Sequence, residues 1–314
     1  MSKITIVGVG SVGATIAYTL THKSIASEIV LIDINKEKVA GEVMDIKQGT
    51  CFRSPISVTG GEYEDAAGSD IVIITSGMAR KPGQTRLELT QTNVNIIKSI
   101  TPNLVKAAPN ALYIIVSNPV DILTYVFTKI SGLPENQILG SGTMLDTARL
   151  RCGLSEHFNI AQNNIHAYVF GEHGDTSFVP WTGAYISGLS VDEYYKYLLS
   201  QGTDIEPLDK EKMEEYVRKS GGQIIANKGA TFYAVATAVV KLCELITASS
   251  DSVTTVSSMM HGEYGIEDVC ISTLTVIGPN GVKGKAPLRM NESEVMKLRA
   301  SADALKAIIA QLEL

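Results

Sequence analysis

The chain has 314 residues, of which 45% are hydrophobic and 19% charged, and its formal net charge is −6. This composition is that of a soluble globular protein, long enough for two lobes or one large α/β unit. The acidic balance and the lack of a basic stripe disfavour nucleic-acid binding. No apolar run reaches the length of a membrane span. Because the first residues lead directly into a strand pattern, we expect no signal peptide.

The cysteines show neither close pairing nor the spacing of metal ligands; they are Cys51, Cys152, Cys243 and Cys270. We therefore expect reduced thiols in a cytoplasmic protein. Because no His, Cys or Asp spacing fits a metal site, we expect no metal and exclude a metal hydrolase.

The N-terminal stretch predicts a phosphate-binding loop. A buried-strand pattern over residues 3–9 leads into a GxGxxG motif and then into a helical pattern over 14–20. Gly8 allows the turn, Gly10 removes a side chain where a pyrophosphate approaches, and Gly13 lets helix and strand pack. The start of the helix offers N–H groups to the phosphates.

Asp33 indicates which dinucleotide binds. It ends a second apolar strand at 29–32, twenty residues after Gly13. Its carboxylate is placed to accept hydrogen bonds from ribose hydroxyls and to repel a 2′-phosphate, so we expect NAD rather than NADP. Val12, inside the loop, is a further expected cofactor contact. A plain turn and a strand-end cap are the structural alternatives for the motif and for Asp33.

Strands and helices alternate through the rest of the first half, with strands expected at 57–59, 70–75 and 111–116 and helices at 35–50 and 87–106. This order predicts a Rossmann-type doubly wound parallel sheet with ligands at the carboxyl ends of the strands. Asn118 follows the last of these strands. We expect its amide to contact the substrate or the nicotinamide ribose; the alternative is a turn cap before Pro119.

A loop at 78–86 follows a strand end and carries two arginines, Arg80 and Arg86. Its Pro-Gly turn is suited to a hinge, and the loop lies where a lid closes over a cleft. An arginine on such a lid polarises a carbonyl and excludes water. A solvated basic loop is the alternative.

The segment 163–176 presents His173 between Glu172 and Gly174. An apolar run at 165–170 predicts a strand, and the glycines on either side of the histidine predict a tight turn that projects the ring into a cleft. A hydrogen-bonded structural histidine is the alternative.

Taken together, these motifs resemble the L-lactate/malate dehydrogenase superfamily over essentially the whole chain, and most closely the bacterial L-lactate dehydrogenases. The resemblance is carried in order by residues 8–13, 80–86, 117–119, 145–149, 171–175 and 228–231.

The resemblance implies a set of catalytic residues. His173 is the expected proton shuttle between the substrate oxygen and solvent, and Asp146 holds its tautomer. Arg149 clamps the substrate carboxylate in a bidentate manner, three residues after Asp146 on one helix face. Arg86 is the lid arginine that polarises the ketone, and Thr231 lines the far wall of the substrate pocket. A surface ion pair is the alternative for Asp146 and Arg149.

Arg80 departs from the lactate pattern. Lactate dehydrogenases usually have glutamine at the matching position, whereas malate dehydrogenases have an arginine that pairs with the second carboxylate of oxaloacetate. A guanidinium facing the methyl group of pyruvate is an unpaired charge. Other positions resemble the lactate type, namely residues 171–173, 181–183 and 229–231. On balance L-lactate dehydrogenase is the expected activity, with malate dehydrogenase or dual specificity as the alternative. A non-catalytic NAD-sensing protein is a remote alternative, since it has no use for His173.

Arg151 and His166 match the two residues that bind fructose 1,6-bisphosphate across a subunit interface in activated bacterial lactate dehydrogenases. An interface charge and a strand-end histidine are the alternatives. The resemblance also implies a homotetramer.

The chain divides into a predicted NAD-binding Rossmann domain, 1–144, and a substrate-binding α+β domain, 145–314. In the second we expect helices at 145–157, 190–199, 210–227, 231–248 and 292–312, and antiparallel strands near 253–259 and 271–277 joined to a hairpin turn at 278–281.

Overall fold

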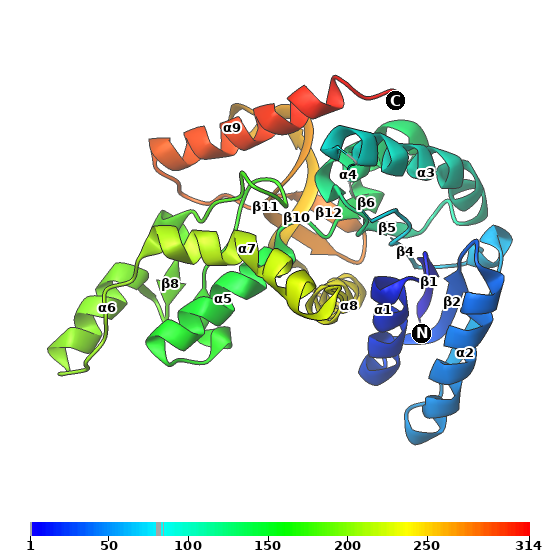
Figure 1. The fold of residues 1–314 in the computed structure, drawn as a ribbon, viewed down its shortest axis with the longest axis horizontal. Helices are drawn as coiled ribbons and strands as arrows, with labels where there is room; N and C mark the ends of the chain where they lie inside the picture. The colour runs from blue at the N-terminus through cyan, green and yellow to red at the C-terminus, as the bar shows by residue number, and fades with distance from the viewer. Residues whose placement is uncertain (1, 80–82, 84) are drawn as a thin grey trace.

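In the computed structural model, which describes residues 2–79, 83 and 85–314, nine strands form one sheet in the order β12-β11-β10-β6-β5-β4-β1-β2-β3 (Figure 1). The strands are β1 Ser2–Val7, β2 Ala26–Ile32, β3 Ser57–Gly60, β4 Ile71–Ile74, β5 Leu112–Ile115, β6 Ile138–Gly140, β10 Ser252–His261, β11 Glu267–Gly278 and β12 Gly281–Lys285. The pairings among β1 to β6 are parallel, and β10 to β12 continue the sheet in antiparallel pairing.

Helices cover both faces of this sheet (Figure 1). They are α1 Ser11–Lys23, α2 Lys36–Gly49, α3 Arg86–Ala107, α4 Val120–Ser131, α5 Met144–Phe158, α6 Val191–Ser200, α7 Lys210–Lys228, α8 Tyr233–Thr247 and α9 Glu292–Ile309. In β4, Ile71 and Ile73 pack with α1 and α8, whereas Val72 and Ile74 pack with α3, α4 and α9. Alternate strand residues thus enter two different cores, which explains why the central strands are continuously apolar.

A third core lies beside the main sheet, at the left of Figure 1. It joins α5, α6 and α7 to a small sheet of three two-residue strands, β7 Ile165–His166, β8 Tyr185–Ile186 and β9 Leu189–Ser190. Within the described ranges, no helix combines the length and the apolar character that a membrane crossing requires.

The structure confirms the doubly wound sheet and the expected helices, but the prediction of a strand over 165–170 was wrong. Only Ile165 and His166 form a strand; the segment then makes isolated bridges from Phe170 to Phe178 and from Gly171 to Ser272. The elements that were not predicted include helix α4 and strand β6. The antiparallel strands do not form a separate sheet either, because β10 pairs with the edge of β6 through Ser257 and Gly140.

Candidate active site

The glycine loop has the geometry that its sequence predicts. Gly8 has a φ of +99°, and a Cβ there would lie 2.6 Å from the Ser76 backbone nitrogen. A Cβ on Gly13 would lie 2.0 Å from the Gly8 carbonyl oxygen. At Gly10 a Cβ would meet no atom of the described residues within 4 Å. The loop is therefore closed toward the protein and open on the side where a phosphate approaches.

The residues around this loop fit a dinucleotide. Helix α1 starts after Gly10 without a side-chain cap and with no acid in its first turn, so its first N–H groups remain available to an anion. The carboxylate of Asp33 accepts hydrogen bonds from Val9 N (2.6 Å) and Asn35 N (3.0 Å), which fix its orientation. Gly8, Gly10 and Asp33 line one cavity of about 550 Å³.

A neighbouring cavity of about 290 Å³ is lined by Val12 and Asn118, both predicted ligand contacts. Asn93, on α3, also lines this cavity and connects two of its walls. Its Nδ2 donates to Asn118 O (2.8 Å), and its Oδ1 accepts from Met78 N (2.8 Å). The sequence analysis missed Asn93. A polar residue beside the buried Val94 and Ile97 of α3 was the available signal.

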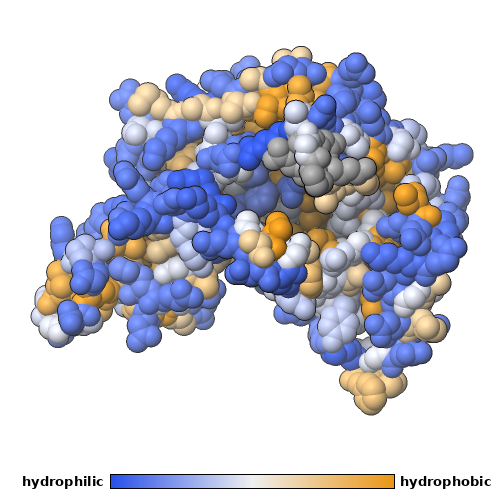
Figure 2. Space-filling model, viewed as in Figure 1, coloured by the Kyte–Doolittle hydropathy of each residue, from blue (hydrophilic) through white to orange (hydrophobic). Residues whose placement is uncertain are grey.

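The three residues expected to perform the chemistry are brought together. Asp146 lies in the first turn of α5. One of its carboxylate oxygens is hydrogen-bonded to His173 Nδ1 at 2.5 Å, and the other accepts a hydrogen bond from Arg149 Nη1 at 2.9 Å. The side chains of Asp146 and Arg149 are 5% and 12% exposed, and that of His173 is 25% exposed. His173 is therefore the member of the cluster that opens to solvent. Figure 2 shows this face of the molecule hollowed near its centre, above α8.

The charges of the cluster set its protonation. The carboxylate of Asp146 raises the pKa of His173 above the ordinary imidazole value, against the opposing effect of burial. Burial acts to raise the pKa of Asp146, but the charges and hydrogen bonds of His173 and Arg149 outweigh it and hold that pKa below its usual value. Asp146 thus stays ionised and stabilises the imidazolium form of His173.

The loop that carries His173 is fixed from helix α9. Ser301 on α9 accepts a hydrogen bond from Glu172 N at 2.9 Å and shares one with the Thr176 hydroxyl at 2.6 Å. Gly174 N donates to Glu172 O, which forms the expected tight turn. Ser301 was not predicted, because its role depends on a contact across 129 positions of sequence.

Helix α7 forms a wall next to the carboxylate clamp. A Cβ on Gly221 would lie 3.2 Å from Arg149 Nη2, so the glycine leaves room for the guanidinium. A glycine pair inside a helical pattern was a sign of such close packing, which the sequence analysis did not use. Thr231 lies in the short connection between α7 and α8 and is partly buried. No hydrogen bond links it to the cluster among the described residues.

Arg86, the predicted lid arginine, lies beside the loop that carries His173. Arg86 is the first residue of α3, and its Nη1 forms an ion pair with Asp175 Oδ2 at 2.6 Å, two residues after His173. Both side chains are largely exposed. The hydrogen bond to Asp175 raises the pKa of Arg86. Arg80, the other predicted lid residue, lies outside the described residues.

Arg151 contacts the residue that follows His166 at the small sheet. Arg151 Nε donates to Ala167 O at 3.2 Å, and its guanidinium lies 5.2 Å from the centre of the Tyr168 ring. His166, the exposed second residue of β7, precedes Ala167 in the chain.

Among the residues that the structure describes, no group of three or more His, Cys, Asp or Glu side chains is arranged to hold a metal.

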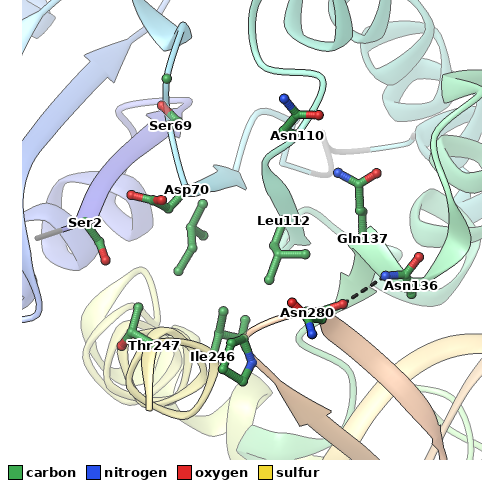
Figure 3. Close-up of a pocket in the computed structure, with 13 residues that line it drawn as sticks. Ser2, Ser69, Asp70, Asn110, Leu112, Asn136, Gln137, Ile246, Thr247 and Asn280 are labelled. Atoms are coloured by element: carbon green, nitrogen blue, oxygen red, sulfur yellow. Dashed lines mark hydrogen bonds between the residues drawn. The ribbon is translucent and has the colours of Figure 1, made fainter. Parts of the chain in front are cut away.

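Another cavity, of about 620 Å³, contains none of the predicted site residues (Figure 3). Figure 3 shows Ser2, Asp70 and Leu112 on its wall, which are at the amino ends of β1, β4 and β5. Ligands of doubly wound sheets bind at the carboxyl ends. The volume of a cavity therefore does not identify the ligand-binding site. The two smaller cavities, which lie at the carboxyl edge of the sheet, are the candidates for it.

Comparison with known proteins agrees with this geometry. Residues 2–140 match the family model of the lactate/malate dehydrogenase NAD-binding domain, and residues 143–313 match that of the alpha/beta C-terminal domain. The chain is 46% identical to L-lactate dehydrogenase of Acetivibrio thermocellus over 314 residues, covering 100% of this chain and 98% of the relative. It is also 46% identical to L-lactate dehydrogenase 1 of Clostridium acetobutylicum, covering 97% and 96%.

Solved structures show the same fold. The minor L-lactate dehydrogenase of Enterococcus mundtii superposes with a TM-score of 0.94 at 33% identity, covering 100% of this chain and 99% of that one. A lactate dehydrogenase from a Medee basin deep-sea metagenome gives 0.93 at 36%, covering 98% of both chains. The glycine loop, the buried cluster and the full-length matches lead to one conclusion: the chain belongs to the lactate/malate dehydrogenase family and is an NAD-dependent oxidoreductase.

Proposed function

We propose that the chain works as an L-lactate dehydrogenase, which interconverts pyruvate and L-lactate. The observation that supports this most directly is the buried cluster in which Asp146 contacts both His173 and Arg149. Such a cluster gives one site a proton donor and a carboxylate clamp, which a 2-keto acid needs together.

Each residue has a defined task in the reaction. The bound nicotinamide supplies the hydride that is transferred to the carbonyl carbon. Because Nδ1 of His173 is held by Asp146, Nε2 is the nitrogen that gives its proton to the carbonyl oxygen. The resulting imidazole regains a proton from solvent, and the same nitrogen accepts the hydroxyl proton when lactate is oxidised.

Two arginines bind the substrate on different sides. Arg149 uses Nη1 to contact Asp146 and retains further N–H donors for the substrate carboxylate. Arg86 exchanges Asp175 for the substrate carbonyl oxygen and stabilises the charge that develops there. Asn118 and Thr231 complete the proposed pocket wall.

Malate dehydrogenase activity, or activity on both acids, is the second candidate, because the sequence has Arg80 where the malate dehydrogenases that it resembles have the arginine that pairs with the second carboxylate of oxaloacetate. NADH oxidation with pyruvate and with oxaloacetate separates the two by their kcat/KM values. Dominant turnover of pyruvate supports the proposal, and dominant turnover of oxaloacetate replaces it by malate dehydrogenase. Binding of NADH without turnover of either acid indicates a non-catalytic sensor.

Regulation and assembly follow the same family likeness. We propose that Arg151 and His166 belong to a fructose 1,6-bisphosphate site of a homotetramer, supported by the contact of Arg151 with Ala167, beside His166. Activation by fructose 1,6-bisphosphate that disappears in Arg151→Gln supports the site. Sedimentation of the wild-type chain as a monomer rules out the tetramer.

The division into domains at residue 144 and a cytoplasmic location are further parts of the proposal. The start of α5 at Met144 supports the boundary. The cysteines are all free thiols, which agrees with a reducing compartment.

A further inference from the structure

A second carboxylate, that of Asp121, contacts the main chain of His173, whereas Asp146 contacts its ring. Asp121 is in the first turn of α4 and is 3% exposed. Its Oδ2 accepts a hydrogen bond from the backbone N–H of His173 at 2.8 Å. Its Oδ1 is buried and has no partner in hydrogen-bond geometry among the described residues. The Ser257 hydroxyl, which is unpaired by the same criterion, is still near enough to lower the pKa of Asp121.

Packing alone does not account for a carboxyl at this position. A buried carboxylate with one unpaired oxygen is destabilising, because the lost hydration is not replaced. An asparagine of the same shape would accept the same N–H without burying a charge. The unpaired oxygen therefore suggests that the charge and the hydrogen bond serve the site rather than the core.

The position of Asp121 along the chain shows what it connects. It stands three residues after Asn118, which lines the cavity beside Val12 of the glycine loop. Asp121 and Asn118 therefore belong to one short turn at the start of α4, in the first half of the chain. His173 belongs to the second half, so this hydrogen bond links the two halves at the point where hydride and proton must meet.

We propose that Asp121 is a positioning residue. It holds the main chain of His173 at a fixed position relative to the turn that contains Asn118, so that Nε2 of His173 points at the substrate carbonyl. This inference rests on the proposed function, in which His173 transfers the proton. An error of about 1 Å in such an alignment lowers a rate by roughly 10²-fold.

The charge of Asp121 has a second effect, on the histidine itself. After Asp146, it is a further anion that raises the pKa of His173. Burial raises the pKa of Asp121 itself to about 6, so the group is ionised at pH 7 and neutral in acid. The titratable groups that interact with it are Glu172 and His173 from the catalytic loop, Cys270 from β11 and Lys285 from β12, and the Ser257 hydroxyl on β10 also acts on it.

Two variants separate the hydrogen bond from the charge. Asp121→Asn keeps an acceptor for His173 N–H and removes the charge, whereas Asp121→Ala removes both. For Asp121→Ala we expect kcat for pyruvate to fall by roughly 10- to 100-fold while NADH binding changes less than about twofold. For Asp121→Asn we expect a kcat within a few-fold of wild type. The pH at which pyruvate kcat/KM is half-maximal should fall, because His173 loses a stabilising anion.

Glu294→Gln is the matched control, since Glu294 is a buried carboxyl that contacts Thr182 and not the catalytic loop. It should lower the melting temperature without moving the pH profile. Rates are expressed per NADH-binding site, so that misfolded protein does not count as lost activity.

The proposal is overturned if Asp121→Ala retains kcat within about twofold, or if Asp121→Asn loses as much rate as Asp121→Ala. An unmoved pH midpoint in Asp121→Asn refutes the effect of the charge on His173. The proposed function is tested separately by the wild type: if it binds NADH and turns over neither pyruvate nor oxaloacetate, the proposed function fails before any variant is compared.

Discussion

The candidate site contains a buried cluster of charges and an exposed ion pair, and the two differ in how far water reaches them. The cluster of Asp146, His173 and Arg149 is largely buried. The Arg86–Asp175 pair is 76% and 70% exposed. Charges in the first environment interact strongly and keep one geometry, whereas charges in the second are screened by water and salt. The buried cluster therefore suits proton transfer and binding of the substrate carboxylate. The exposed Arg86–Asp175 pair suits an arginine that must leave its partner to contact the substrate.

The largest expected effect tests the buried side of this comparison. His173→Ala removes the proton donor, so we expect kcat for pyruvate to fall by roughly 10³-fold or more, within the range general acid catalysis spans. NADH should bind as before, because the glycine loop and Asp33 are untouched. Stopped-flow turnover and NADH fluorescence titration measure the two quantities. Turnover close to wild type would remove His173 from the mechanism.

The exposed side predicts a large effect on rate with almost none on stability. Arg86→Gln should lower kcat by about 10²–10³-fold, since a donor to the developing oxyanion is lost. Its melting temperature should stay near that of wild type, because an exposed ion pair contributes little to folding. Arg53→Gln, an exposed arginine away from the site, is the control for loss of a surface charge. A stability loss in Arg86→Gln without a rate loss would reverse the assignment.

The smallest effect concerns the wall next to the clamp. In Gly221→Ala the new Cβ lies 3.2 Å from Arg149 Nη2, so we expect the KM for pyruvate to rise a few-fold as the guanidinium shifts. Gly222→Ala, the next residue of the same helix, meets nothing within 4 Å. It should leave KM unchanged and stabilise the fold by ~0.5–1 kcal/mol. Equal KM values for both variants would show that Gly221 does not shape the clamp.

The sequence could predict the features of the site that depend on neighbouring residues in the chain. The glycine loop and the strand pattern follow from local chemistry, so Gly8, Gly13 and the carboxyl-edge location of Asn118 were predictable. The roles of His173, Asp146 and Arg149 were assigned from the resemblance to the lactate/malate dehydrogenases. The structure adds that one carboxylate contacts both cations.

The residues that were missed act across long sequence separations. Asp121 reaches His173 across 52 positions and Ser301 reaches Glu172 across 129, and neither contact has a local pattern. The short β7 was misjudged for a related reason. The apolar residues of 165–170 are buried by packing against other elements, so their hydrophobicity predicted a strand without a complete strand pairing.

The most direct test of the central role of His173 is the pH dependence of kcat/KM in both directions with the wild-type enzyme. Pyruvate reduction needs protonated His173, so its rate should fall as pH rises through the pKa of that group; lactate oxidation needs the neutral form, so its rate should rise. Because Asp146 raises the pKa of His173, both curves should share one midpoint above the ordinary imidazole value of 6.5. Curves that respond to pH in the same direction, or a common midpoint below 6.5, would contradict the account.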